Sequence, residues 1–585
     1  PLREVVAWFP HVGRVGAEVY RRESLTAGQI VEGPAIVLDS ASTIVIDPGF
    51  RGRLEDNSLF VLLDEGAPEG HSPREFERLD PVRLEVLGNR FMSIAERMGT
   101  VLRNTSISTN IKERLDYSCA VFDANGGLVA NAPHIPVHLG AMSETVEAVC
   151  NEFSELCPGD VIVTNDPYKG GSHLPDVTVV APVFIEESLS FFVGARGHHA
   201  DIGGKAPGSM PADSKTLEEE GVLLQAFPVV RDGAFKESEL RRRLSAGAYP
   251  ARMPDDNVAD LEAMIASVES GKTLLREMSM ELGLSTLIMT MSQLQESAGR
   301  KVAAEIGKLG EGTRRHVDQM DDGTVLSVGL EVKGERLIID FAGTGSAHAG
   351  NLNAPKAVVR AAVIYVLRAL VDERIPLNGG CLDPVEIRIP EGSLLNPPQN
   401  SAVVGGNVET SQRVVDVLLG AIGKVAASQG TMNNVAFGNE KFGYYETIGG
   451  GAGAGLGFHG ASGVHTHMTN TRITDPEVLE TRYPVILERF SLRRGSGGQG
   501  TFCGGDGLAR QYRFLEPVMV SLLTERRNTA PYGLAGGEEG TKGKNFLQRA
   551  GQVEKPVGGR VSLELASGDR LRIESPGGGG YGFRA

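Results

Sequence analysis

Residues 1–63 alternate short apolar runs with turn sequences. The apolar runs are rich in β-branched residues and lie at 36–38, 43–46 and 60–63. Asp47-Pro48-Gly49 between two of them is typical of a turn. Residues 1–63 therefore predict a small β-rich unit. The polar stretch 64–77, which contains Gly and Pro, predicts a linker.

Helical spacing begins after the linker. Apolar residues recur at three- and four-residue intervals from Leu84 to Leu102, and Asp80-Pro81 suits an N-cap followed by a first helical turn. A helix is also expected at 141–156. Short apolar runs around it predict strands at 118–122, 128–130, 161–163, 177–180 and 191–193. We interpret residues 78–212 as a mixed α/β region.

The pattern from 213 to 310 is mainly helical, with two or three long helices expected between Asp256 and Leu309. Residues 311–585 predict a glycine-rich α/β region. Its expected elements are strands at 325–341, 517–523 and 560–574 and helices at 355–371 and 410–427. The tail 576–582 is either flexible or packed against backbone. The predicted fold class is mixed α/β (α+β) and multi-domain, with mixed sheets and long helices.

Composition narrows the class of protein. The 585 residues are enough for about three to four domains. A net charge of −16 argues against nucleic-acid and anionic membrane partners, and no apolar run has the length of about 18 residues needed for a membrane span. Five dispersed cysteines favour a reducing, cytoplasmic location over a disulfide scaffold. The start at Pro1 suggests the interior of a longer polypeptide.

Two sequences resemble nucleotide-binding motifs without their context. Gly271-Lys272-Thr273 has the end of a phosphate-binding loop, but Ala266 stands where the motif needs glycine and the segment reads as mid-helix. Residues 455–460 match GxGxxG within a stretch already dense in glycine, with no preceding buried strand. We therefore expect no nucleotide cofactor site in this chain.

Histidines and aspartates gather in one short part of the chain. His134, His138, His173, His198 and His199 are five of the twelve histidines, and they are accompanied by aspartates at positions 116, 123, 166, 176 and 201. His173 and Asp176 share an irregular loop and can turn to one ion, His198 or His199 follows a predicted strand, and Asp116 could complete the set. Two imidazoles and two carboxylates suit Zn²⁺, Mn²⁺ or Fe²⁺. The alternative is a group of histidines that are satisfied by ordinary hydrogen bonds.

A second polar group lies late in the chain on glycine-flanked loops. Amide, hydroxyl, imidazole and guanidinium groups of this kind can bind a polar, planar substrate such as an amide. The candidate substrate-binding residues are Asn433, Asn434, Tyr445, His465, His467 and Arg472. Turn formation and helix capping are the structural alternative.

Nine segments of the chain together resemble one known family: 104–106, 113–118, 165–168, 170–176, 196–204, 350–355, 428–434, 443–447 and 465–476. Residues from about 78 to 585 resemble the B-type half of the hydantoinase/5-oxoprolinase family, and the late segments are most similar to ATP-dependent 5-oxoprolinases. Residues 1–63 resemble the C-terminal end of the A-type half.

The resemblance implies a reaction and a division of labour. Such an enzyme converts 5-oxo-L-proline, ATP and water to L-glutamate, ADP and phosphate. ATP–Mg would be bound by the A-type half, fused or separate, and Asp116, His173, Asp176 and His198 would hold a divalent Zn or Mn ion in this chain. The catalytic residue stays open, with candidates Asp116, His199, Asp201 and Glu446.

The same resemblance leaves other activities open. Related B-type chains serve N-methylhydantoin hydrolysis, hydrolysis of other lactams, and carboxylation of acetone or acetophenone. A chain that only positions the ATP-binding half is the non-enzymatic alternative. We expect a homo-oligomer of A–B units, no activity from this chain without the A-type half, and no nucleic-acid or membrane partner.

Overall fold

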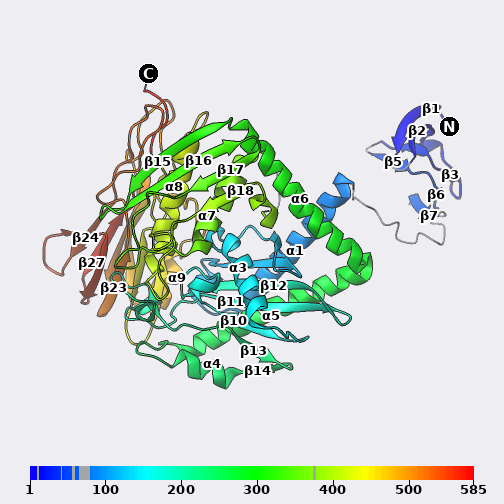
Figure 1. Ribbon diagram of the computed structural model, residues 1–585. Helices are drawn as coiled ribbons and strands as arrows, with labels where there is room; N and C mark the ends of the chain where they lie inside the picture. Colours follow the sequence, from blue (N-terminus) through cyan, green and yellow to red (C-terminus); the bar gives the residue numbers. More distant parts are fainter. Residues whose placement is uncertain (10–11, 41, 56–59, 65–79, 373–376, 585) are drawn as a thin grey trace. The chain divides into compact units, whose positions relative to one another are not determined.

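The computed structural model describes residues 1–9, 12–40, 42–55, 60–64, 80–372 and 377–584 (Figure 1). The chain divides into two compact units, Pro1–Leu79 and Asp80–Ala585. Residues 65–77 of the predicted linker (64–77) lie outside the described residues. None of the described helices is both long and apolar enough to cross a membrane. Several sheets with long helices confirm the predicted mixed α/β, multi-domain fold class.

The N-terminal unit contains two small sheets around Val31, Val37 and Ile46, which are buried. The predicted apolar runs lie in β4, β5 and β7, whereas charged residues inside β1 and β2 hid these two strands from sequence analysis. One sheet has the order β1-β2-β4-β5 and the other β3-β6-β7. The strands are β1 Arg3–Phe9, β2 Gly13–Arg21, β3 Ile30–Glu32, β4 Ala35–Leu38, β5 Thr43–Ile46, β6 Phe50–Leu54 and β7 Phe60–Asp64.

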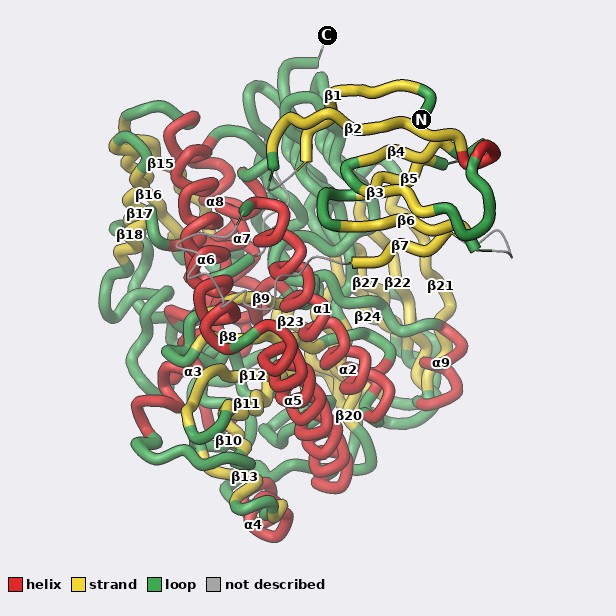
Figure 2. The backbone as a smooth tube through the Cα atoms, turned by 90° about the vertical axis from the view of Figure 1, so that its right-hand side faces the viewer, coloured by secondary structure: helices red, strands yellow, loops and turns green. Residues whose placement is uncertain are grey.

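A seven-stranded antiparallel sheet begins the second unit, with the order β14-β13-β10-β11-β12-β8-β9. Helices α1 and α5 lie side by side across one face (Figure 2), and α3 covers the other, where its apolar residues pack on Phe122 and Phe192. The helices are α1 Pro81–Thr105, α3 Pro136–Glu152 and α5 Pro254–Leu282. The strands are β8 Tyr117–Asp123, β9 Leu128–Asn131, β10 Val161–Thr164, β11 Asp176–Ile185, β12 Ser188–His198, β13 Phe227–Arg231 and β14 Ala234–Phe235.

Local sequence explains most of these boundaries. The Asp80 side chain accepts a hydrogen bond from Arg83 N at 3.0 Å, which confirms the predicted N-cap of α1. Pro136 starts α3 ahead of the predicted helix 141–156, in keeping with the preference of proline for the first helical turn. Short α2, Thr109–Lys112, follows α1 and is capped by Ser108.

The helical prediction for 213–310 is correct only in its second part. Residues 213–236 contain the hairpin β13–β14, whose turn residues Asp232 and Gly233 both have positive φ, 53° and 72°. An Asp-Gly pair after a β-branched run is a hairpin signal, so the information was present in the sequence. The helices that follow are α4 Glu237–Leu244, α5, and α6 Leu284–Lys308.

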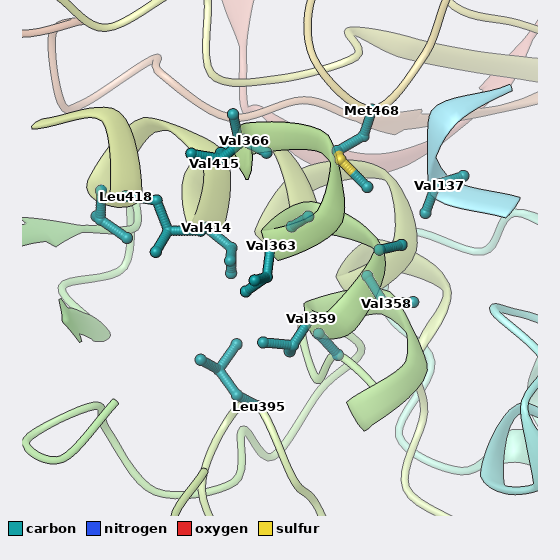
Figure 3. Close-up of a cluster of buried hydrophobic side chains, with 14 of the residues drawn as sticks. Val137, Val358, Val359, Val363, Val366, Leu395, Val414, Val415, Leu418 and Met468 are labelled. Atoms are coloured by element: carbon teal, nitrogen blue, oxygen red, sulfur yellow. The ribbon is translucent and has the colours of Figure 1, made fainter. Parts of the chain in front are cut away.

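Helices α7 and α8 pack on a four-stranded sheet and form a large apolar core. Figure 3 shows Val363 and Val366 of α7 near Val414 and Val415 of α8. Helix α8 continues from a single π-helical turn, Gly406–Thr410, and ends at Ile422 rather than at the predicted residue 427. The elements are β15 Gly312–Gln319, β16 Val325–Lys333, β17 Arg336–Asp340, β18 Val385–Arg388, α7 Lys356–Leu370 and α8 Ser411–Ile422.

Two further sheets enclose a second core in the C-terminal part, with the orders β20-β19-β23-β26 and β21-β22-β27-β24-β25. The predicted strand 560–574 is two strands, because a turn at Gly568 sends β26 and β27 to different sheets. The elements are β19 Asn434–Gly438, β20 Gly443–Glu446, α9 Pro476–Arg482, β21 Val485–Arg493, β22 Gly507–Phe514, β23 Val518–Leu523, β24 Lys544–Gln548, β25 Lys555–Val557, β26 Arg560–Leu565 and β27 Arg570–Glu574.

Glycine-rich segments between these strands pack backbone against backbone. We call this arrangement the glycine bundle; its segments are 449–455, 496–507, 533–540 and 576–582. Gly578 N donates to Gly505 O, and Gly498 N donates to Gly578 O, both at 2.9 Å. A Cβ on Gly578 would overlap the backbone oxygen of Ala452. The tail is therefore packed against backbone, the second of the two predicted alternatives.

Candidate metal centre

Two neighbouring strands bring the histidine-rich segments together. Asp176 is the first residue of β11 and His198 the last of β12, and the two are direct partners in the antiparallel register. The loop that enters β11 carries His173. Antiparallel partners have Cα atoms about 4.5–5.5 Å apart. The β11–β12 hairpin thus places Asp176 and His198 side by side, although they are well separated in sequence.

His173, Asp176 and His198 form a buried cluster, the metal triad. One ligand atom from each lies within 4.8 Å of the other two. His173 Nδ1 is 2.9 Å from Asp176 Oδ2, and the two imidazole centroids are 5.0 Å apart in an edge-to-face arrangement. His173 Nε2, Asp176 Oδ1 and His198 Nε2 are buried and have no hydrogen-bond partner among the described residues. These three unpaired atoms converge from neighbouring parts of the sheet, and their nitrogen and oxygen lone pairs could bind one metal ion.

Hydrogen bonds at the other ring nitrogens leave these lone pairs free. His198 Nδ1 lies 3.0 Å from the carbonyl oxygen of His199 and 3.0 Å from Asn110 Nδ2; because a carbonyl oxygen can only accept, the first contact favours the hydrogen on Nδ1. His173 Nδ1 donates in the same way to the Asp176 carboxylate. In both rings Nε2 then keeps its lone pair. Donation of the second ring N–H to a carbonyl or carboxylate is the usual arrangement of metal-binding histidines.

His138, at the start of α3, is a fourth group at the triad that sequence analysis noted without assigning. Its Nε2 lies 3.2 Å from Asp176 Oδ2, and its Nδ1 lies 3.0 Å from Ser118 Oγ. Ser172 Oγ also donates to Asp176 Oδ2. Oδ2 is therefore held by protein donors while Oδ1 stays free. The signal was present as His134 and His138 before a helix, but sequence does not say which faces Asp176.

Charge and burial set the protonation states of the triad. Burial by itself raises the pKa of Asp176, but the neighbouring His173 and His138, through charge and hydrogen bonds, lower it well below its usual range. Burial, reinforced by the charge of His173, lowers the pKa of His198 well below its usual range. A carboxylate beside a neutral imidazole is the state that a divalent ion requires.

Asp116, the predicted fourth ligand, lies beside the triad but outside the set of atoms within 4.8 Å. Its carbonyl oxygen accepts a hydrogen bond from His198 N at 3.0 Å. Its carboxylate Oδ2 is 3.7 Å from Arg114 Nη1. Burial raises the pKa of Asp116, and the Arg114 charge opposes that effect. Coordination by Asp116 stays a prediction.

The structure separates the roles of the two adjacent histidines. Asn257 Nδ2, on α5, lies 2.9 Å from His199 Nδ1 and donates to Asp201 O at 2.8 Å. His199 Nδ1 is therefore engaged by Asn257, and His199 Nε2 is buried without a hydrogen-bond partner among the described residues. His198, not His199, belongs to the metal triad.

Asp201 and Glu446, two of the candidate catalytic residues, are engaged elsewhere. The Asp201 carboxylate accepts hydrogen bonds from Gly203 N, Gly208 N and Arg252 and so shapes the loop after β12. The Glu446 carboxylate accepts from Arg510 at 2.8 Å and from Tyr444 at 2.9 Å. Alternation along β20 turns Glu446 away from the face on which Tyr445 meets His198.

Tyr445 is the candidate substrate-binding residue that the structure brings to the triad. Its ring stacks on His198 with a centroid distance of 4.7 Å and an interplanar angle of 2°. Its hydroxyl donates to Asn434 Oδ1 at 2.7 Å, and Asn434 Nδ2 donates to Glu409 Oε1 at 2.6 Å. The Arg114 guanidinium lies 4.9 Å from the Tyr445 ring centroid. These contacts hold the Tyr445 ring against one face of the His198 ring and so fix its orientation.

The π-helical turn Gly406–Thr410 contributes Asn407, which contacts the triad, and Glu409, which is linked to it through Asn434 and Tyr445. Asn407 Nδ2 lies 3.2 Å from His173 Nδ1. Glu409 is fully buried, its Oε2 has no hydrogen-bond partner among the described residues, and burial raises its pKa well above the usual range. Single π-helical turns inside helices are frequent at functional sites. Sequence analysis missed both residues because a π-turn has no clear sequence signal.

The other candidate substrate-binding residues are dispersed. Asn433 is satisfied by Gln429, Ile448 O and Arg527. His467 Nε2 pairs with Asp416 at 3.0 Å.

His465 and Arg472 differ in exposure. His465 is half-buried, and burial together with the Arg114 charge lowers its pKa to about 4. The Arg472 side chain is exposed, and its backbone N donates to Arg114 O at 2.8 Å.

Known proteins share both the sequence and the fold. The chain is 48% identical to 5-oxoprolinase 1 of Arabidopsis thaliana, over 96% of this chain and 46% of that protein. It is 45% identical to 5-oxoprolinase of Dictyostelium discoideum, over 98% of this chain and 46% of that protein. The chain thus spans about half the length of these relatives.

A solved structure matches the fold. The crystal structure of ATP-dependent caprolactamase from Pseudomonas jessenii matches with a TM-score of 0.79 and 24% identity, over 86% of this chain and 91% of that chain. At this identity the match shows the fold alone.

Family models match both parts of the chain. Residues 9–65 match the hydantoinase/oxoprolinase C-terminal domain, and residues 80–584 match hydantoinase B/oxoprolinase. These matches confirm both resemblances found from sequence. The chain therefore belongs to the hydantoinase B/oxoprolinase family.

Proposed function

We propose that this chain is the B-type half of an ATP-dependent hydrolase of cyclic amides, with 5-oxo-L-proline as its substrate. The whole reaction would convert 5-oxo-L-proline, ATP and water to L-glutamate, ADP and phosphate. The observation that carries the proposal is the buried triad with three free donor atoms. The names of relatives that are 45% and 48% identical over nearly the whole chain support the choice of substrate.

The chemistry explains why two halves are needed. An unstrained lactam is a poor electrophile, and its amine is a poor leaving group. Phosphorylation of the lactam oxygen by ATP gives an imidate-like carbon that water can attack. The ring C–N bond of the adduct then breaks as the amine takes a proton, which opens the ring to an acyl phosphate, and a second water hydrolyses this acyl phosphate to the carboxylate and phosphate. We assign ATP–Mg binding and this first step to the A-type half, and hydrolysis to the B-type half.

His173 Nε2, Asp176 Oδ1 and His198 Nε2 would hold the divalent ion, Zn²⁺ or Mn²⁺, with Asp116 as a further ligand or proton carrier. Such an ion supplies a Lewis acid that lowers the pKa of water. The protein's own groups set the charge and the orientation of these ligand atoms: Asp176 is held ionised, and Tyr445 fixes the His198 ring. Burial raises the pKa of Asp116, the direction that favours a role for this carboxyl in proton exchange.

Metal analysis and turnover test the proposal. We expect about one Zn or Mn ion per chain, retained by the native protein and by His459→Ala, which changes a histidine outside the triad, and lost in His173→Ala. In the assembled A–B enzyme, His173→Ala should lower formation of L-glutamate by at least ~100-fold. A metal-free native protein, or a fully active His173→Ala enzyme, would support a chain that only positions its partner.

Hydrolysis of another lactam is the second candidate, because the matching solved structure is named a caprolactamase. The assembled enzyme should be given 5-oxo-L-proline, caprolactam, N-methylhydantoin, and acetone with bicarbonate in separate assays. ADP and the organic product are measured in each. The largest kcat/KM is expected for 5-oxo-L-proline, and preference for another compound would reassign the substrate while leaving the metal centre intact.

A further inference from the structure

A polar pocket separate from the metal triad lies in the C-terminal part of the chain. It is formed by the turn between β15 and β16 and by the ends of β23 to β26. Its volume is about 670 Å³. None of its lining residues belongs to the metal triad. Three acidic and three basic side chains line it, together with the apolar Phe546, Pro556 and Val557. The charged residues are Asp321, Asp322, Glu525, Arg527, Lys544 and Arg560.

Glu525 places a buried carboxyl at this pocket with one oxygen unused. Its side chain is only 1% exposed. Oε2 accepts a hydrogen bond from Asp321 N at 2.7 Å, whereas Oε1 has no hydrogen-bond partner among the described residues. The nearest cation, Arg560 Nε, is 3.8 Å from Oε1, which is too long for a hydrogen bond. A buried, unsatisfied carboxyl oxygen calls for a donor from a ligand.

Cationic groups line the same pocket. Lys544 is exposed, and no described residue pairs with its ammonium group. Arg560 Nη2 contacts Asp322 at 3.0 Å, and the Arg560 side chain is 24% exposed. Arg527 Nε is buried without a partner among the described residues, while its other nitrogens hold Asn433 and Asn545. A ligand carboxylate can therefore be met by charge-assisted hydrogen bonds.

We propose that this pocket binds a small α-amino acid as a zwitterion. The ligand ammonium donates to Glu525 Oε1, its carboxylate lies against Lys544 and Arg560, and its aliphatic part packs on Phe546 and Val557. The balanced lining charge favours a ligand that carries both signs over a simple anion or cation.

The pocket also borders the segment that supports the metal centre. Arg527 Nη1 donates to Asn433 Oδ1 at 2.7 Å, and the next residue, Asn434, holds the Tyr445 hydroxyl. L-Glutamate is therefore a sensible first probe, since it is the product of the proposed reaction. That choice of probe rests on the proposed function, whereas the site itself does not.

Calorimetric titration of the full chain tests this site. L-Glutamate, glycine and L-alanine are compared with glutarate, which lacks the ammonium group, and with n-butylamine, which lacks the carboxylate. We expect saturable binding of at least one amino acid and no saturation by either half-ligand. Lys544→Met and Glu525→Gln should each weaken Kd by roughly tenfold or more. Lys555→Met, an exposed lysine outside the pocket, should leave Kd unchanged.

The outcomes separate this proposal from the proposed function. Absence of saturable amino-acid binding up to ~20 mM, a fragment-like affinity, overturns the site, and so does binding that Lys544→Met leaves intact. Because Lys544 is exposed, this variant remains informative even where Glu525→Gln is unstable. Binding of glycine or L-alanine without L-glutamate keeps the site and removes its link to the product.

Discussion

At the scale of single residues, the free ligand atoms of the metal triad are oriented by contacts that other atoms of the same side chains make with the protein. Asp176 Oδ2 is held by His138, His173 and Ser172, and the His198 ring is held by a carbonyl and by Tyr445. The triad residues themselves could be named from sequence because they lie close together in it. His138 and Tyr445 could not be assigned, because their contacts depend on how α3 and β20 pack.

Two substitutions at Tyr445 should separate its hydroxyl from its ring. Tyr445→Phe keeps the stack on His198 but leaves Asn434 Oδ1 without its donor, so we expect a loss of roughly 1–3 kcal/mol of stability with nearly unchanged metal affinity. Tyr445→Leu removes the stacked ring and should weaken metal binding by about 10–100-fold.

Chelator competition measures the metal affinity of each Tyr445 variant, and thermal unfolding measures its stability. Equal metal affinity for both variants would show that the stack does not position His198.

At the scale of elements, helices α3 and α7 cross at close distance. This crossing joins the seven-stranded sheet that carries the metal triad to the apolar core of α7 and α8. A Cβ on Gly140 in α3 would lie 2.6 Å from Ala361 Cα in α7. The missing side chain therefore sets the distance between the two helices. Because α3 also carries His138, this crossing helps to place a residue that contacts Asp176 of the metal triad.

Gly140→Ala should accordingly be destabilising although alanine is the better helix former. Overlap with the α7 backbone should lower the free energy of unfolding by roughly 1–3 kcal/mol. Gly307→Ala is the matched control, because Gly307 lies in α6 and its Cβ would meet nothing closer than Glu335 Cγ, at 3.5 Å. That variant should be neutral or up to ~1 kcal/mol more stable. Denaturant titrations compare the two, and equal effects would contradict the close-crossing explanation.

Element type was easier to predict from sequence than element partners. The spacing of apolar residues located α1, α5 and α7 because long periodic patterns are unambiguous. The single run 560–574 gave no sign that its two halves join different sheets, since that division depends on long-range pairing. For the segments of the glycine bundle, the sequence indicated only close backbone approaches and not which segments pack together.

At the scale of the whole molecule, a buried ion network ties distant segments together. Asp318 of β15 contacts Arg413 of α8 at 3.1 Å and Arg526 after β23 at 2.7 Å. Arg526 also reaches Asp416, which pairs with His467. Segments that lie far apart in the sequence are thus fixed by one cluster of charges.

Burial by itself raises the pKa of Asp318, but the Arg526 and Arg413 charges outweigh it and lower that pKa well below the usual range. A carboxyl whose pKa is lowered on folding stabilises the protein above its unfolded pKa, near ~3.9, and loses that contribution as the pH falls further. Asp318→Asn should therefore cost roughly 3–5 kcal/mol at pH 7. The difference from the native protein should narrow below about pH 4.

Denaturant unfolding measured between pH 3 and pH 8 checks the expectation for Asp318. Asp255→Asn is the control, because Asp255 makes an exposed ion pair with Arg241 and should have little effect at any pH. A difference for Asp318→Asn that does not change with pH would exclude an ionic origin.

The glycine bundle affects how this protein responds to temperature. Its segments bury peptide groups against peptide groups, with almost no side chains between them. Exposure of apolar surface raises the heat capacity on unfolding, whereas exposure of polar surface lowers it. The bundle should therefore add enthalpy to the unfolding transition while contributing little or negatively to its heat capacity. Calorimetry should accordingly find a flatter stability curve than the length of the chain suggests.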